Sequence, residues 1–152
     1  VGEGYERDEL TAQIADLDAG GWIRLAGRVS DDELISLYRR AWTVASTSVR
    51  EGWGMTITEA AACGTPAVAT RIAGHRDSVA EGRSGLLASD WPEMVNQLRS
   101  VLTDADLRTR LSEVALKHAA EFTWEACAFN AFAPLARDAL RRREPRGGIG
   151  RP

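Results

Sequence analysis

The sequence predicts an α/β fold, a Rossmann-like parallel sheet with helices on both faces that ends in two or three consecutive helices. Short β-prone runs alternate with amphipathic helical patterns as far as Asp90, and only helical periodicity follows. Such alternation is typical of a parallel sheet covered by helices, which binds ligands at the carboxyl ends of its strands. Chemistry is therefore expected in the loops at those strand ends.

The amino-terminal part predicts one helix and one strand. Apolar residues recur at helical spacing, and a Gly-Gly pair then ends the helix. The run "WIRLAG" (22–27) follows as a strand. The chain opens on "VGEG", which resembles the end of a strand, so we expect a fragment of a longer protein that lacks its first strand. The apolar positions of the helix are Leu10, Ile14 and Leu17.

Three more strands and the helices between them are expected before Asp90. Ser30, followed by Glu33, is a capping-box pattern that starts a helix with one apolar stripe. The strands are "WTVAST" (42–47), "PAVAT" (66–70) and "SGLLAS" (84–89). Between them lie a helix, "GMTITEAAAC" (54–63), and a short helical turn near "HRDSVAEG" (75–82).

The remainder predicts helices and a tail. Two apolar stripes follow Asp90, and Thr123 is the expected N-cap of a long final helix, which Pro134 should kink. No linker interrupts the chain before its end, so residues 1–143 are expected to form one domain. The Gly, Pro and Arg content of the last residues predicts a disordered tail over 144–152.

Composition excludes several classes of protein. The chain has 152 residues, 44% of them hydrophobic, and no apolar run long enough to span a bilayer. Its formal net charge of −3 argues against a nucleic-acid partner. The start lacks a signal-peptide pattern, and Cys63 and Cys127 show no CxxC motif, which favours reduced thiols and a cytoplasmic location. Both cysteines are expected as small core hydrophobes.

The stretch "REGWGMTITEAAACGTPAVAT" (50–70) offers an anion site flanked by two acids. The helix is expected to start near Gly54, where unpaired amide groups and the positive end of the dipole favour a phosphate. Gly52 and Gly54 permit close backbone approach. Glu51 and Glu59 lie eight positions apart, and eight helical residues span about 12 Å, roughly the length of a sugar-diphosphate-ribose unit. Each carboxylate could therefore hold the hydroxyls of one sugar.

These residues resemble a known family. "EGWGMTITEAAACGTPAVAT" looks like the E-x7-E signature of retaining glycosyltransferases with the GT-B fold, the glycosyl transferases group 1, commonly written EGFGxxxxEAMAxGxPVVAT. Four other segments resemble that family in the same order, namely "VGEGYERDEL", "RLAGRVSDDELISLYRRA", "AGHRDSVAEGRSGLL" and "FTWE". The resemblance covers the chain nearly to Arg143 and implies the carboxy-terminal, donor-binding half of the GT-B fold.

The resemblance also implies a role for each site residue. Glu51 would contact donor-sugar hydroxyls as the catalytic carboxylate, and Glu59 would hold the ribose hydroxyls. The donor would be a UDP-sugar or GDP-sugar, its transfer would retain the anomeric configuration, and neither a metal nor a cofactor would be needed, because helix amides stabilise the leaving diphosphate. Backbone contacts are implied to the sugar and diphosphate from Gly52, Trp53, Gly54, Met55 and Thr56, and to the base from Arg28 and Val29.

Departures from the family pattern limit these implications. Trp53 stands where Phe is usual, Ala73 precedes Gly74 where the family has two glycines, and Asp77 replaces Glu. The upstream strand with the family's phosphate-binding Arg and Lys is absent, and so is the amino-terminal acceptor domain of the same polypeptide. That domain is the expected partner, and the fragment alone is expected to be inactive. Contact with the inner face of a membrane is expected only through that absent half.

Each feature also has a structural interpretation. Glu51 and Glu59 could be a capping acid and an exposed helix position, Arg28 a solvated loop charge, and His75 a structural histidine. The "DAD" at 104–106 resembles a metal-binding motif of other glycosyltransferases but opens a helix, where acids cap the dipole. The alternative function is a non-catalytic module that binds a nucleotide-sugar or a protein. An epimerase or phosphorylase that shares the fold is a third hypothesis.

Overall fold

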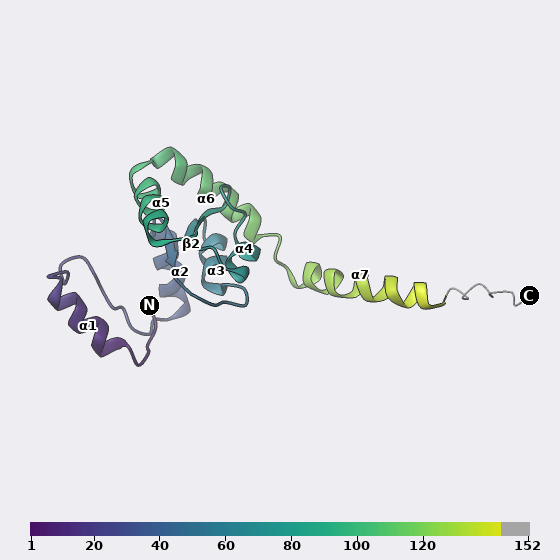
Figure 1. The fold of residues 1–152 in the computed structure, drawn as a ribbon, viewed down its shortest axis with the longest axis horizontal. Coiled ribbons are helices and arrows are strands. Elements are labelled where there is room, and N and C mark those ends of the chain that lie inside the picture. Colours follow the sequence, from purple (N-terminus) through teal and green to yellow (C-terminus); the bar gives the residue numbers. More distant parts are fainter. Residues whose placement is uncertain (144–152) are drawn as a thin grey trace, which may run out of the picture.

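The computed structural model describes residues 1–143, in which three strands and seven helices are present (Figure 1). The strands are β1 (Val44–Ser46), β2 (Ala67–Thr70) and β3 (Gly85–Ala88). The helices are α1 (Arg7–Asp16), α2 (Asp31–Arg40), α3 (Met55–Ala62), α4 (Ala73–Ser78), α5 (Trp91–Thr103), α6 (Ala105–Ala119) and α7 (Trp124–Arg143). The predicted tail, 144–152, lies outside the described residues.

The three strands form one sheet in the order β1-β2-β3, and all of its strand pairs are parallel, as the sequence predicts. Side chains alternate along β2 and pack into two separate parts of the core, one on each face of the sheet. Ala67 and Ala69 pack with Ile57 of α3 on one face, whereas Val68 packs with Met94 of α5 and with α6 on the other. Helices therefore cover both faces of the sheet, which confirms the predicted fold class.

The expected strand over 22–27 is wrong, because no strand includes those residues. The segment makes a backbone contact with the start of the chain, where the amide of Gly2 donates to the carbonyl of Gly27 at 2.7 Å. A strand is stabilised by pairing with neighbours on a sheet. Within the described residues the sheet ends at β1, so this segment has no strand beside it to complete a ladder.

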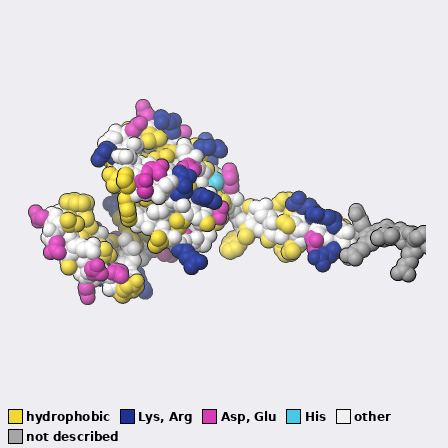
Figure 2. Space-filling view, in the orientation of Figure 1, with side chains coloured by type: hydrophobic (Ala, Val, Ile, Leu, Met, Phe, Trp, Pro, Cys, Tyr) yellow, Lys and Arg dark blue, Asp and Glu magenta, His cyan; other side chains and the backbone are white. Residues whose placement is uncertain are grey.

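One prediction of burial, that of Cys127, is wrong, and helix α1 is present but uncovered. Helix α1 buries none of its residues, and the apolar Leu10 and its C-cap Leu17 are 43% and 73% exposed. It lies to one side of the main body, with hydrophobic surface on its flank (Figures 1 and 2). Cys63 is half-buried, but Cys127 is exposed on α7 and is no core residue. Apolar periodicity predicts the helix but not whether another element covers it.

Helix α7 extends away from the sheet (Figure 1). The hydroxyl of Thr123 caps it by accepting from the amide of Ala126 at 3.1 Å, as predicted. Pro134 lies inside the helix and does not end it. Its large apolar side chains are mostly exposed, and Figure 2 shows hydrophobic surface on the part nearest the body. These side chains are Trp124, Phe129, Phe132, Leu135 and Leu140.

Leu111 of α6 tests the core that supports β2. It is 1% exposed and packs in the cluster with Val68. We expect Leu111→Ala to lower the free energy of unfolding by about 2–5 kcal/mol, because it leaves a cavity. Leu116→Ala on the same helix is the control, since Leu116 is 51% exposed. Urea unfolding followed by circular dichroism measures both, and equal losses would contradict this placement of the core.

Candidate functional site

The loop 47–54 follows the carboxyl end of β1 and leads into α3. Gly54 is the N-cap of α3 and adopts a left-handed conformation, with φ +86°. A Cβ atom there would also lie 3.1 Å from Cδ2 of His75 and 3.3 Å from Oγ of Ser78. Both the dihedral angle and the close approach require glycine. The first amides of α3, those of Met55 and Thr56, follow directly and form the positive end of the helix.

Gly74 of α4 lies directly against the backbone of the same loop. A Cβ atom on Gly74 would lie 2.5 Å from the carbonyl oxygen of Glu51 and 2.9 Å from the carbonyl carbon of Gly52. The loop backbone therefore rests directly on the α4 backbone. Larger side chains at Gly74 would displace the loop, which explains why a glycine follows Ala73 even though the usual glycine pair is incomplete.

The side chain of Glu51 is exposed but has a partner in the same loop, two residues after the end of β1. Ser48 donates a hydrogen bond from its hydroxyl to Oε1 of Glu51 at 2.9 Å. The carbonyl of Ser48 in turn accepts from the hydroxyl of Thr70 at the end of β2. The ends of two neighbouring strands thus hold the residue that orients Glu51.

Trp53 turns back toward the body of the protein. Its Nε1 donates to the hydroxyl of Thr58 at 2.8 Å, and its ring meets Phe122 edge to face, with centroids 4.9 Å apart. The aromatic side chain therefore anchors the loop to α3 and to the segment after α6. Because the side chain of Trp53 is engaged in these contacts, this residue can offer a ligand only its backbone.

Glu59 lies on the side of α3 that faces α2. The hydroxyl of Tyr38 donates to Oε2 of Glu59 at 3.1 Å. Burial raises the pKa of Tyr38, and the hydrogen bond and negative charge of Glu59 raise it further, to about 12. Tyr38 therefore stays protonated and remains a donor to Glu59 throughout the neutral range.

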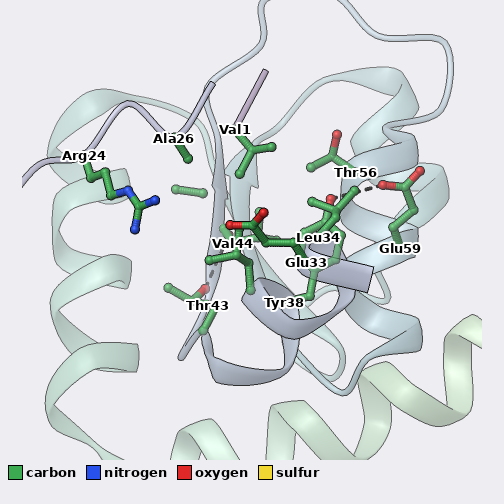
Figure 3. A pocket seen from close by; sticks show the side chains of 13 residues that line it. Val1, Arg24, Ala26, Glu33, Leu34, Tyr38, Thr43, Val44, Thr56 and Glu59 are labelled. Atoms are coloured by element: carbon green, nitrogen blue, oxygen red, sulfur yellow. Dashed lines mark hydrogen bonds between the residues drawn. The ribbon is translucent and has the colours of Figure 1, made fainter. Parts of the chain in front are cut away.

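A cavity of about 630 Å³ lies beside β1 and is bordered by Thr56 and Glu59. Figure 3 shows these two on one side, with Arg24 and Ala26 from the segment 22–27 on the other. Glu51 does not line it. Its wall is mainly apolar, with a few charged and hydroxyl groups. The remaining lining residues are Val1, Glu33, Leu34, Leu37, Tyr38, Ala41, Thr43, Val44 and Ala45.

The predicted base-contacting residues lie near this cavity in sequence but do not line it. Arg28 is exposed and Val29 is half-buried, and both follow the segment that supplies Arg24 and Ala26. The sequence predicts no site role for Arg24 or Tyr38, and it indicates Glu33 only as part of a helix cap. Tyr38 belongs to the apolar stripe of α2, but its hydroxyl faces a polar partner on the next helix, Glu59.

Metal ligation finds no support among residues 1–143, where no group of three or more His, Cys, Asp or Glu side chains is arranged around one point. The first acid of the "DAD" stretch, Asp104, caps α6 by accepting from the amide of Leu107 at 2.8 Å. This agrees with the capping interpretation of that stretch.

Comparisons with known proteins give one family and one fold. The model of the family Glycosyl transferases group 1 matches residues 1–118 of this chain. A D-inositol 3-phosphate glycosyltransferase of Corynebacterium urealyticum is 39% identical over 130 residues, which cover 82% of this chain and 30% of that protein. Its counterpart in Stackebrandtia nassauensis is 38% identical over 138 residues, covering 89% and 30%. The chain thus spans less than a third of the length of these curated relatives.

Solved structures show the same similarity. Sucrose-phosphate synthase from Thermosynechococcus elongatus superposes with a TM-score of 0.73 at 26% identity, over 91% of this chain and 35% of that one. HepE of Anabaena, in complex with UDP and glucose, superposes with a TM-score of 0.73 at 25% identity, over 91% of this chain and 39% of that one.

Among the described helices, none combines the length and the apolar character needed to cross a membrane.

The Tyr38–Glu59 contact can be tested by titration. We expect Glu59→Gln to lower the pKa of Tyr38 from about 12, because the carboxylate charge that raises it is removed. The measurement is an ultraviolet titration in a Tyr5→Phe background, since Tyr5 is the only other tyrosine in the sequence. Glu33→Gln, in the same cavity, is the control.

The raised pKa of Tyr38, which burial causes first and the contact with Glu59 increases, makes stability depend on pH. The pKa of Tyr38 is higher in the folded state, so its contribution is complete below the unfolded value, about 10, and is lost as the pH rises through about 12. An unchanged pKa of Tyr38 in Glu59→Gln would mean that the two side chains do not meet in solution.

Proposed function

The chain belongs to the glycosyl transferases group 1 family, and on this premise we propose that residues 1–143 bind the nucleotide-sugar donor of a glycosyl transfer. The observation that carries the proposal is the Glu51–Gly54 loop, which rests on Gly74 at the carboxyl ends of the strands and presents the first amides of α3. A UDP-sugar or GDP-sugar is the proposed donor. The complexes of HepE with UDP and glucose support this class of ligand.

Each part of the proposed site takes one part of the donor. Glu51, the proposed catalytic carboxylate, contacts the hydroxyls of the transferred sugar, and the backbone from Gly52 to Thr56 faces the diphosphate. Glu59 holds the ribose hydroxyls at the border of the cavity beside β1. The backbone at Arg28 and Val29 meets the base. Glu51 and Glu59 then form an E-x7-E pair of the retaining class.

The proposed chemistry is retaining and independent of metal. Negative charge grows on the diphosphate as its bond to the sugar breaks, and the amides and dipole of α3 oppose that charge from a fixed position. Amide groups that are already fixed in place stabilise the transition state more than the ground state, because the charge on the diphosphate is largest in the transition state. Analysis of the anomeric configuration of the product of the full-length enzyme tests this assignment.

A further strand is proposed to fill the cavity beside β1. Within the described residues β1 is an edge strand, and its outer side borders apolar side chains of α2, including Leu34 and Leu37. Helix α2 buries none of its residues, although its apolar positions form a stripe. An added parallel strand would pair with β1, cover this stripe and connect the segment 22–27 to the sheet.

We propose that this strand and the acceptor-binding half belong to the rest of the same polypeptide, in line with the longer relatives. The isolated 152 residues would then bind donor without transferring the sugar. The whole enzyme would work in the cytoplasm, with contact to the inner face of the membrane through its other half.

Titration of UDP and of GDP against the protein tests the ribose assignment. Calorimetry should show binding of one of the two, and we expect Glu59→Gln to weaken it by about 10-fold to 100-fold, the effect of losing hydrogen bonds to a charged group. Glu33→Gln removes a carboxylate from the same cavity and should change binding little. Equal affinity of the wild type and Glu59→Gln would exclude Glu59 as the ribose ligand.

A second candidate function, an interaction module, is favoured by α7. Phe129 and Phe132 are 71% and 69% exposed on a helix that extends from the body (Figure 1). Exposed apolar surface of this kind commonly marks an interface.

We expect the isolated chain to self-associate through α7, with a mass by light scattering that rises above 16.5 kDa as the concentration increases. The double variant Phe129→Ser, Phe132→Ser should stay monomeric because it removes the apolar contact surface. Arg137→Ser on the same helix is the control and should associate like the wild type. A monomeric wild type at all concentrations would argue against this module.

A further inference from the structure

His75 is a buried polar side chain for which the proposed function has no role. It lies on α4 behind the loop 47–54 and is 0% exposed. Burying an imidazole is costly unless its nitrogens are hydrogen-bonded, and both of them are. Nδ1 lies 2.8 Å from the carbonyl oxygen of Thr70, and Nε2 lies 3.1 Å from the hydroxyl of Ser46. The ring therefore connects α4 to the ends of β2 and β1.

The partners determine which nitrogen carries the proton. A carbonyl oxygen only accepts, so Nδ1 donates to Thr70. In the neutral ring Nε2 is then an acceptor, and the hydroxyl of Ser46 donates to it. His75 therefore fixes the rotamer of Ser46 as well as the position of its own ring.

A polar route leads from this ring to the carboxylate of Glu51. The hydroxyl of Thr70, which lies 3.2 Å from Nδ1, donates to the carbonyl of Ser48 at 2.5 Å. The hydroxyl of Ser48 donates to Oε1 of Glu51. It also lies 3.5 Å from that of Ser46, in a contact without a shared proton, because Ser46 donates its one proton to His75. Two of the residues that touch the His75 ring thus also touch the residue that orients Glu51.

A steric route leads to the same loop. Cδ2 of His75 forms part of the wall against which Gly54 packs, at 3.1 Å from the position of an added Cβ atom. Gly74, the neighbour of His75, supports the backbone of Glu51 and Gly52. A displaced ring would therefore disturb the start of α3 as well as the loop.

We propose that His75 is a positioning residue that fixes the loop 47–54, and through Ser48 fixes the carboxylate of Glu51. Glu59 lies outside its reach, because Tyr38 of α2 holds that carboxylate instead. The consequence for the donor rests on the proposed function. His75 should govern the extra affinity for a nucleotide-sugar over the bare nucleotide, since Glu51 is the proposed sugar ligand and Glu59 the proposed ribose ligand.

The test compares His75→Leu with His75→Asn in the whole chain. Leucine fills the volume without polar atoms, whereas the amide of asparagine can still donate to Thr70. Two measurements are made, the amide resonances of Gly52 and Gly54 by NMR, and the affinities for UDP and UDP-glucose by calorimetry. Leu111→Ala is the matched control, because it destabilises the fold without touching the loop.

We expect His75→Leu to shift both glycine resonances and to reduce the ratio of UDP-glucose to UDP affinity by about 10-fold, as Glu51→Gln would. His75→Asn should restore part of both effects. Leu111→Ala should change neither. Ser46→Ala replaces His75→Leu if the latter does not fold, and should shift the same resonances.

Unchanged glycine resonances in folded His75→Leu would overturn the proposal. So would a wild-type affinity ratio in His75→Leu when Glu51→Gln lowers that ratio. If the wild type binds neither ligand, a UDP-sugar is excluded as the donor of the proposed function, while the resonances still decide whether His75 positions the loop.

Discussion

The close contact between the loop backbone at Glu51 and Gly52 and the α4 backbone at Gly74 is the constraint on which the site depends. A side chain at Gly74 would lie 2.5 Å from the carbonyl of Glu51, so the two segments touch without any side chain between them. That contact fixes the path of the loop that connects β1 to α3. It places the first amides of α3 and the carboxylate of Glu51 on one edge of the sheet, where parallel α/β folds bind their ligands.

The core beneath this contact is built for close packing. Strand β2 is buried on both faces and consists mainly of small residues, so α3 approaches the sheet closely on one side and α5 and α6 on the other. Gly85 of β3 shows the same tightness, because a Cβ atom there would lie 2.6 Å from the carbonyl of Ala67. A sheet packed this tightly gives the loop a rigid support.

Local signals predicted the elements whose environment is present in the chain. Gly54 predicted the start of α3, Ser30 and Thr123 predicted helix caps, and the strands around β2 were found by their apolar runs. The predicted strand over 22–27 was wrong, and α1 is left uncovered, because each needs a neighbour that the described residues lack. The bonding of His75 could not be predicted, because its partner Ser46 lies 29 positions away and no local pattern connects them.

The two carboxylates of the proposed donor site are held in different ways. Glu51 is oriented from the sheet, through Ser48 and the strand ends, so its position follows from the buried core. Glu59 meets Tyr38 of α2, a helix that buries none of its residues and borders the cavity beside β1. The proposed sugar end is therefore preorganised within these 152 residues. The proposed ribose end depends on α2, whose apolar stripe would be fixed in place by the strand that completes the sheet.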